Sequence, residues 1–135
     1  MATNRYLLDT HCLIWFQDDY SKIPGKILDL IADPKNSILF SQVSLFELAI
    51  KQKIGKLPGF SASMEDVYNQ ALRDSFSFLN IQNSHIYIYA TIPLLENHRD
   101  PFDRLLIATA ITEEAIILSA DDKFKLYGDM IKVIW

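Results

Sequence analysis

The sequence predicts an α/β protein in which a central, mostly parallel sheet is flanked by helices, and three observations support this prediction. Short apolar runs typical of strands alternate with longer stretches of helical periodicity along the whole chain. The 135 residues, of which 50% are hydrophobic and 22% charged, are too few for two separate cores. No internal repeat, linker or low-complexity segment divides them. We therefore expect residues 1–135 to form a single domain.

The first half of the chain predicts two strands, each followed by helices. Pro24 is suited to the start of a helix, and Gly55 with the Pro58-Gly59 pair is suited to ending one. The elements expected are, in order, a strand over residues 5–8, a helix after Asp9 and Thr10, a helix from Pro24 to the turn residues 33–36, a strand over 37–43 and a helix from Ser44 to about Lys53.

The second half continues the alternation. Residues 56–62 are the only long loop that we expect, and Ser63 caps the helix behind it. The Asp100-Pro101 pair has the pattern of an N-cap followed by proline at the first helical position. The elements expected are, in order, a helix from Ser63 through Leu72, a strand over 76–81, a helix over 84–92, a helix from Asp100 to Glu114, a strand over 115–118 and a last strand over 132–135.

Composition excludes several classes of protein. The formal net charge of -4 argues against a protein that coats nucleic acid by bulk electrostatics. The longest apolar runs fall far short of the roughly 18 residues that a membrane span requires, and Asp9 interrupts the first one before it could act as a signal sequence. Cys12 is the only cysteine, so no intrachain disulfide and no cysteine-rich zinc site can form. We expect a soluble protein of the reducing cytoplasm that does not engage membranes.

Acidic residues follow the predicted strands at positions where parallel sheets place their chemistry. The carboxyl ends of parallel strands meet at one edge of the sheet, and ligands bind there. The acids expected at this edge are Asp9, Glu47, Asp100, Asp103, Asp121 and Asp122. Carboxylates are preferred ligands of Mg²⁺ and Mn²⁺, and such ions can activate water and stabilise a leaving oxygen in phosphodiester cleavage.

Helix capping is the alternative explanation for each of these acids taken singly. Ser44 and Glu47 have the spacing of a capping box, and Asp100 with Asp103 fits an N-cap followed by an acid near the positive end of the helix dipole. Asp9 could cap the first helix, and Asp121 could cap the turn after its strand. Only the convergence of all of them on one edge favours a catalytic site.

Other phosphate chemistries fit the sequence poorly. A haloacid dehalogenase-type phosphatase requires a second Asp two residues after the first, where this chain has His11. A response-regulator receiver requires paired acids after its first strand, and only Asp9 is present there. The four glycines are scattered and form no phosphate loop, and the three histidines lack metal-ligand spacing. We expect His11 and His98 to be surface or hydrogen-bonded histidines and not ligands.

Four segments together resemble a known family. They are Leu7 to Trp15 with the Asp9-Thr10 pair, Ser44 to Lys51 around Glu47 followed by Gly55-Lys56-Leu57, His98 to Ala108 with the Asp-Pro-Phe-Asp-Arg run, and Ile117 to Asp121. In this order and spacing they resemble a PIN domain of the VapC toxin type, over nearly the whole chain. The last strand, ending at Trp135, also matches that fold.

The resemblance implies a metal-dependent endoribonuclease that cleaves structured RNA such as tRNA or rRNA and is inhibited by a cognate antitoxin. Asp9, Glu47 and Asp103 match the three core acids, and Asp121 matches the fourth; together they would hold Mg²⁺ or Mn²⁺. As accessory residues, Asp100 would assist with water or metal, and Thr10 would orient the first acid by a hydrogen bond. Ser119-Ala120 departs from the more frequent Thr-Arg pair before the last acid.

Basic residues near these motifs are candidates for contacts with RNA. Lys51, Lys53 and Lys56 stand at the end of the Glu47 helix, and Arg99 stands beside the Asp100 motif. A solvated helix end is the simpler explanation for the three lysines. Arg104 directly follows Asp103, where a guanidinium can hold a phosphate or orient a carboxylate.

The chain also carries more large apolar residues than one small core is expected to need. We therefore expect an exposed apolar groove for a peptide of the antitoxin, and a homodimer. The residues expected to form the groove are Trp15, Phe16, Phe46, Leu57 and Phe60. The alternative function is a PIN-like module that binds a protein or RNA without cutting it.

Overall fold

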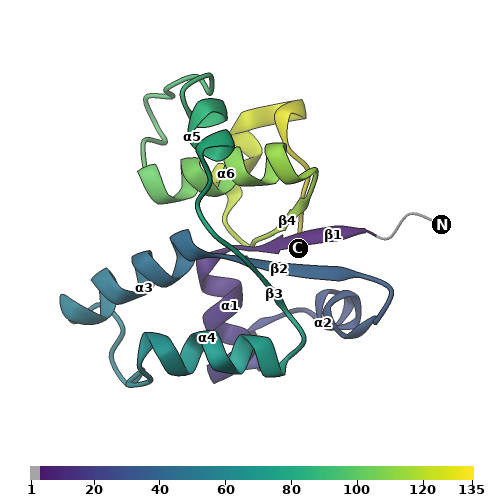
Figure 1. Ribbon diagram of the computed structural model, residues 1–135, viewed down its shortest axis with the longest axis vertical. Helices are drawn as coiled ribbons and strands as arrows, with labels where there is room; N and C mark the ends of the chain where they lie inside the picture. The colour runs from purple at the N-terminus through teal and green to yellow at the C-terminus, as the bar shows by residue number, and fades with distance from the viewer. Residues whose placement is uncertain (1–3) are drawn as a thin grey trace.

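A computed structural model describes residues 4–135, and these residues build one parallel sheet (Figure 1). The sheet has five strands within this range, in the order β3-β2-β1-β4-β5, and every neighbouring pair is parallel. The strands are β1 (Arg5–Leu8), β2 (Ser37–Ser41), β3 (Ser77–Leu79), β4 (Ile116–Leu118) and β5 (Val133–Ile134). The predicted α/β class is confirmed, and the sheet is wholly parallel where a mostly parallel one was expected.

Helices connect the strands in the predicted places. The α-helices are α1 (Thr10–Asp18), α2 (Gly25–Ala32), α3 (Gln42–Lys53), α4 (Met64–Arg73), α5 (Asn83–Tyr89) and α6 (Pro101–Glu113). Two 3₁₀ segments, η1 (Tyr20–Lys22) and η2 (Asp122–Met130), were not predicted. The irregular segment 90–100, which contains an isolated bridge between Leu95 and His98, is a second long loop beside residues 56–62. The expectation of only one long loop was therefore wrong.

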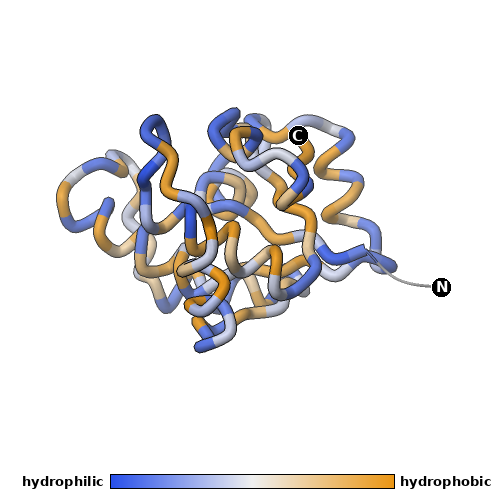
Figure 2. Tube along the Cα trace, turned by 90° about the horizontal axis from the view of Figure 1, so that it is seen from above, coloured by the Kyte–Doolittle hydropathy of each residue, from blue (hydrophilic) through white to orange (hydrophobic). Residues whose placement is uncertain are grey.

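Alternating strand residues divide the buried side chains between the two faces of the sheet. Tyr6 and Leu8 of β1 pack with residues of α1, α2 and α4, whereas Leu7 packs with residues of α6 and η2. Figure 1 shows the corresponding layers, with α5 and α6 on one side of the sheet and α1, α2 and α4 on the other. Figure 2 shows hydrophobic stretches running through the interior and hydrophilic ones gathering at the outer turns. Burial of a large apolar side chain stabilises a fold by about 1.5–3 kcal/mol, so both faces contribute.

The strand order creates a crevice beside β1. From β1 the chain adds β2 and β3 on one side, and then crosses to β4 and β5 on the other. In an open parallel sheet, ligands bind at the carboxyl ends of the strands where this reversal occurs. The crevice between the ends of β1 and β4 is therefore the expected place for a site.

Helix α3 begins at Gln42, two residues before the predicted start at Ser44. The side chain of Ser41 is its N-cap and accepts a hydrogen bond of 3.0 Å from the amide of Val43. The predicted capping box between Ser44 and Glu47 is therefore wrong, and so is the extension of the strand to Val43. Ser41, the last residue of β2, caps α3 in place of Ser44 because serine is a favourable N-cap residue and Ser41 comes first along the chain. Ser44 and Glu47 consequently lie inside the helix and are buried.

No helix among residues 4–135 is long and apolar enough to cross a membrane. The longest, α6, has 13 residues and packs against the sheet.

Candidate active site

The predicted acids line one cavity at the carboxyl end of the sheet. Its volume is about 170 Å³. Asp9 follows β1, Glu47 comes from the second turn of α3, Asp103 from the first turn of α6, and Asp121 from the turn after β4. The complete lining is Asp9, Thr10, His11, Glu47, Lys51, His98, Asp100, Asp103, Asp121 and Lys123. Five carboxylates thus face two lysines, and Asp122 is not part of the lining.

Asp9 caps a helix and also belongs to the cavity. Its Oδ1 accepts a 2.7 Å hydrogen bond from the amide of Cys12, and its Oδ2 accepts one from the hydroxyl of Ser119. Burial raises the pKa of Asp9 to about 6, against the opposing effect of these two hydrogen bonds, and the nearby charges of Asp121 and Glu47 raise it further. Asp9 therefore caps α1, but the hydrogen bonds that it accepts do not offset the unfavourable burial of its negative charge.

Glu47 is held by two partners of different kinds. The hydroxyl of Thr10 donates a 2.6 Å hydrogen bond to Oε1, and the hydroxyl of Ser44 lies 3.0 Å from Thr10 Oγ1. Oε2 forms an ion pair of 2.9 Å with Lys51, one turn further along α3. Thr10 therefore orients Glu47 and not Asp9, contrary to the prediction, because its side chain points across to α3.

Asp103 is the second acid with a raised pKa. Its side chain is 20% exposed, and its Oδ2 lies 3.0 Å from Nε2 of His98. Burial raises the pKa of Asp103 to about 6, and Asp100 and Glu47 add to this, whereas the hydrogen bond from His98 opposes it. Asp100 itself is the predicted N-cap of α6, because its Oδ1 accepts from the amides of Phe102 and Asp103.

Asp121 and Asp9 are connected through Ser119. The amide of Asp121 donates a 3.0 Å hydrogen bond to the hydroxyl of Ser119, which itself donates to Asp9. Asp121 Oδ1 accepts from the amide of Lys123 and so begins η2, as its predicted capping role requires. The role of Ser119 was not predicted, since its most visible feature was the departure from the Thr-Arg pair. A hydroxyl two residues before an acid at a strand end was the available signal.

The basic residues predicted near the motifs are placed very differently. Arg104 is 3% exposed and does not line the cavity; its guanidinium donates to the carbonyl oxygens of Ile92 and Pro93 at 3.0 and 2.8 Å. The expectation that it holds a phosphate was wrong, because the segment 90–100 folds over it. Lys51 faces the cavity, whereas Lys53, Lys56 and Arg99 are exposed outside its lining.

The two histidines near the acids also differ. His98 is buried between Asp103 and Tyr127, in agreement with the expected hydrogen-bonded histidine. His11 lies at the cavity with its ring 5.7 Å from that of Trp15. Partial burial and the nearby charge of Lys51 lower its pKa.

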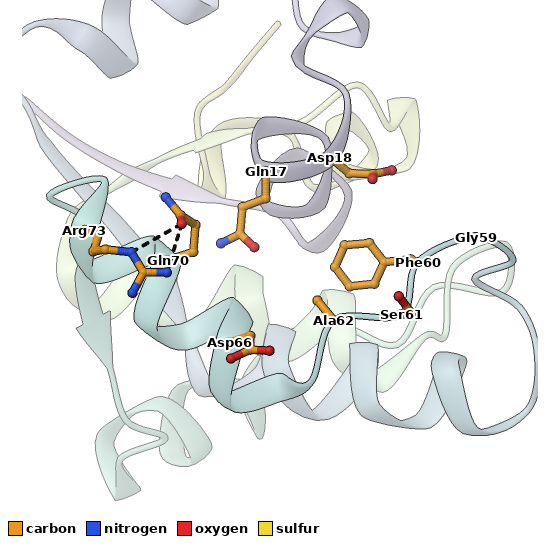
Figure 3. Close-up of a pocket in the computed structure, with 9 residues that line it drawn as sticks. All are labelled: Gln17, Asp18, Gly59, Phe60, Ser61, Ala62, Asp66, Gln70 and Arg73. Atoms are coloured by element: carbon orange, nitrogen blue, oxygen red, sulfur yellow. Dashed lines mark hydrogen bonds between the residues drawn. The ribbon is translucent and has the colours of Figure 1, made fainter.

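A second hollow lies away from the acids, between α1, the 56–62 loop and α4 (Figure 3). It measures about 360 Å³, and Phe60 turns its ring toward Gln17 and Asp18 while Gln70 and Arg73 hydrogen-bond to each other. Its complete lining is Gln17, Asp18, Gly59, Phe60, Ser61, Ala62, Asp66, Gln70 and Arg73. Most of these residues are polar or charged.

The predicted apolar groove does not form from the residues named for it. Trp15, Phe16, Leu57 and Phe60 are half-buried and pack against the core on the α1 side of the sheet. Phe46 alone of the five is largely exposed, at 58%, and it packs edge-on against Phe102 with the ring centres 5.7 Å apart. Packing against the core thus explains four of the five apolar residues, and Phe46 is the exception.

The donor set of the cavity fits a hard divalent cation. Carboxylate oxygens are the ligands that Mg²⁺ and Mn²⁺ prefer, and burial raises the pKa values of Asp9 and Asp103 to about 6, an effect that a bound cation would oppose. Among residues 4–135, no three acidic, histidine or cysteine side chains are already close enough together to enclose an ion. Binding of an ion would thus require movement of side chains, for example of Glu47 away from Lys51.

Comparisons with known proteins agree with this architecture. A sequence model described as "PIN domain" matches residues 6–129. No curated protein sequence matches the chain significantly.

Solved structures share the fold. A chain of VapBC2 from Rickettsia felis, bound to a DNA fragment from its promoter, is 18% identical with a TM-score of 0.67, covering 96% of this chain and 97% of that one. A chain of VapBC-1 from nontypeable Haemophilus influenzae is 17% identical with a TM-score of 0.65, covering 96% of each chain. A chain of a toxin-antitoxin complex from Klebsiella pneumoniae is 19% identical with a TM-score of 0.61, again covering 96% of each. On the sequence match over nearly its whole length, this chain belongs to the PIN domain family.

Proposed function

We propose that residues 1–135 act as a single metal-dependent endoribonuclease domain, the toxin of a type II toxin-antitoxin pair, with tRNA or rRNA as substrate. The observation that carries the proposal is the convergence of Asp9, Glu47, Asp103 and Asp121, from four separate elements, on one cavity at the reversal point of the sheet. Capping accounts for Asp9 and Asp121 but not for Glu47 or Asp103, neither of which caps a helix.

In this proposal the four carboxylates hold Mg²⁺ or Mn²⁺. An ion bound there would supply a water acidic enough to attack a phosphodiester and charge to stabilise the leaving oxygen. Thr10 fixes the carboxylate of Glu47, Ser119 fixes that of Asp9, and Asp100 fixes the first turn of α6 from which Asp103 projects. Lys51, Lys53, Lys56 and Arg99 are proposed to attract the RNA backbone, with Lys51 nearest to the cavity.

An isosteric substitution at Asp9 tests the proposal. Asn retains the oxygen that caps α1, so Asp9→Asn should fold as well as wild type while losing RNA cleavage. Mn²⁺ at 100 times its Kd should stabilise the wild type by about 2.7 kcal/mol and the variant much less. Cleavage of total RNA with Mn²⁺ or with EDTA, paired with thermal melts, measures both effects.

Lys26→Gln is a suitable control, since Lys26 lies outside the acidic cavity. Full activity of Asp9→Asn in the same preparation would refute the catalytic assignment. A stable wild type that binds Mn²⁺ or RNA but cleaves nothing would favour the non-catalytic binding module.

The proposed protein partners are a cognate antitoxin and a second copy of the chain. Support for the antitoxin is that the solved structures with this fold include chains of toxin-antitoxin complexes. Support for a homodimer is limited to large apolar side chains left exposed, among them Phe46, Tyr87 and Leu94. Sedimentation of the isolated protein should show a dimer. A monomer that also fails to associate with the antitoxin encoded beside it would contradict both.

A further inference from the structure

We infer that His98, held by Tyr127, is a positioning residue that fixes the carboxylate of Asp103 for catalysis. This inference rests on the proposed nuclease function and adds two residues to it. His98 Nε2 lies 3.0 Å from Asp103 Oδ2, and His98 Nδ1 lies 2.6 Å from the hydroxyl of Tyr127. The imidazole therefore bridges an acid of the cavity to a phenol of η2.

The hydrogen-bond donors and acceptors in this network can be assigned consistently, starting from Arg104. The guanidinium of Arg104 can only donate, and its Nη1 lies 3.5 Å from the Tyr127 oxygen. Tyr127 can then donate its proton to His98 Nδ1, and the opposite ring nitrogen carries the proton that is donated to the Asp103 carboxylate. One tautomer of the neutral ring satisfies every contact, so the network specifies both the ring and the carboxylate that it holds.

Burial makes this arrangement rigid. His98, Arg104 and Tyr127 are 3%, 3% and 5% exposed, and the rings of His98 and Tyr127 pack at 75° with their centres 5.4 Å apart. The segment 90–100 is tied down by Arg104 through the carbonyls of Ile92 and Pro93. Water therefore cannot easily replace any member of the network.

The two carboxylate oxygens of Asp103 consequently differ in their hydrogen bonding. Oδ2 is occupied by His98, while Oδ1 accepts no hydrogen bond from the described residues 4–135. With its rotamer held by His98, Asp103 presents Oδ1 to a cation or a water in the cavity without first having to be ordered. Outer partners of metal-binding carboxylates typically change metal affinity or activity by about 10- to 100-fold.

The test compares three variants at this network with a matched control. His98→Ala removes the donor, His98→Gln retains an amide N–H that can reach Asp103, and Tyr127→Phe removes only one oxygen. The control is His85→Ala, because His85 is equally buried and also hydrogen-bonded to a carboxylate, that of Glu113, outside the cavity. Mn²⁺ affinity is measured by calorimetry with the metal alone, and kcat and KM are measured with RNA.

We expect His98→Ala to weaken Mn²⁺ binding or kcat by about 10- to 100-fold with KM for RNA unchanged, and His98→Gln to recover most of that loss. Tyr127→Phe should lie between them, and it decides the question if His98→Ala fails to fold. His85→Ala should lower the melting temperature without changing Mn²⁺ affinity.

Two outcomes would overturn the inference. If the wild type cleaves RNA while Tyr127→Phe and the His98 variants keep its Mn²⁺ affinity and kcat within about twofold, His98 is merely structural. If the wild type neither binds Mn²⁺ nor cleaves RNA, the proposed function fails and the positioning role fails with it.

Discussion

Helix α6 carries a carboxylate near each end that is paired with a buried histidine from another segment, and the two pairs have opposite electrostatics. At its start His98 lies 3.0 Å from Asp103, and at its end His85 lies 3.1 Å from Glu113. The hydrogen bond from His85 lowers the pKa of Glu113, with help from Arg5, whereas burial raises that of Asp103 to about 6. The same two side-chain types thus stabilise an ionised carboxylate at one end and fail to do so at the other.

The surroundings explain the difference. Glu113 has a cationic partner, since Arg5 donates to its carboxylate and to its backbone carbonyl. The Asp103 side chain is exposed to a similar extent, 20% against 17% for Glu113, but its charged neighbours are the acids Asp100 and Glu47. A single hydrogen bond outweighs desolvation only where the local charges agree with it. The first turn of α6 therefore holds a carboxylate whose ionised form is unfavourable in the folded protein. Such groups are typical of functional sites.

Neutralising the two carboxylates separates these roles and has the largest expected effect. Asp103→Asn should reduce RNA cleavage by at least about 100-fold, because several kcal/mol of transition-state stabilisation depend on the metal site. It should leave the metal-free protein as stable as wild type or more so. Glu113→Gln should retain activity and lose about 1 kcal/mol of stability through its partly buried hydrogen bonds to Arg5 and His85. Cleavage assays and urea melts of both variants measure this, and the reverse pattern would exchange the two assignments.

The pH dependence of the metal-free protein gives an intermediate effect. Asp9 and Asp103 have folded pKa values of about 6 against an ordinary 3.8, so between these values the folded state binds more protons than the unfolded chain. The free energy of unfolding should therefore rise as pH falls from about 7 to 5, by about 1 kcal/mol per acid.

Glu113 works in the opposite direction. Its pKa lies below the ordinary 4.5, so the stability that it contributes is present above that value and is lost as pH falls through the folded pKa. Melts in EDTA from pH 4 to 8 should therefore show a maximum near the middle of the range, and Asp9→Asn should flatten the rise between pH 7 and 5. A stability that increases steadily up to pH 8 in the wild type would contradict the raised pKa values.

Removal of the positive charge of Lys51 or Arg5 has the smallest expected effect. Lys51 and Glu47 form an i,i+4 pair whose removal in Lys51→Gln should change stability by less than about 0.5 kcal/mol. Because Lys51 lines the cavity, the same variant should raise KM for RNA a few-fold, and this dependence should weaken at high salt. Arg5→Gln should leave KM unchanged. An unchanged KM in Lys51→Gln would remove Lys51 from the RNA-contacting residues.

The sequence was sufficient to predict the strands, the helices and the acids of the cavity, for physical reasons that are local. Short apolar runs determine the strands, and apolar residues at helical spacing determine the helices. An acid that follows a parallel strand lies at the edge of the sheet where the carboxyl ends of the strands meet. What remained hidden depends on contacts distant in sequence. Thr10 reaches Glu47 across 37 residues, and His98 meets Tyr127 across 29.

Arg104 shows the same limit most clearly. Its position next to Asp103 indicated a role at the cavity, but a helix turns successive side chains by about 100°, so neighbours in sequence face different ways. The interior direction of Arg104 became definite only because residues 92 and 93 supply carbonyl oxygens to it. The direction of the Arg104 side chain therefore depends on how the segment 90–100 folds over α6.

The double engagement of Asp9 has a consequence for heredity. Asp and Asn codons differ by a single base, and Asn at position 9 would keep the oxygen that receives the Cys12 amide. The amide nitrogen of Asn would take the place of the oxygen that receives the Ser119 proton, and the Ser119 hydroxyl can rotate to accept there instead. Under the proposed function, one point mutation would therefore remove cleavage while the product still folds and still binds its antitoxin.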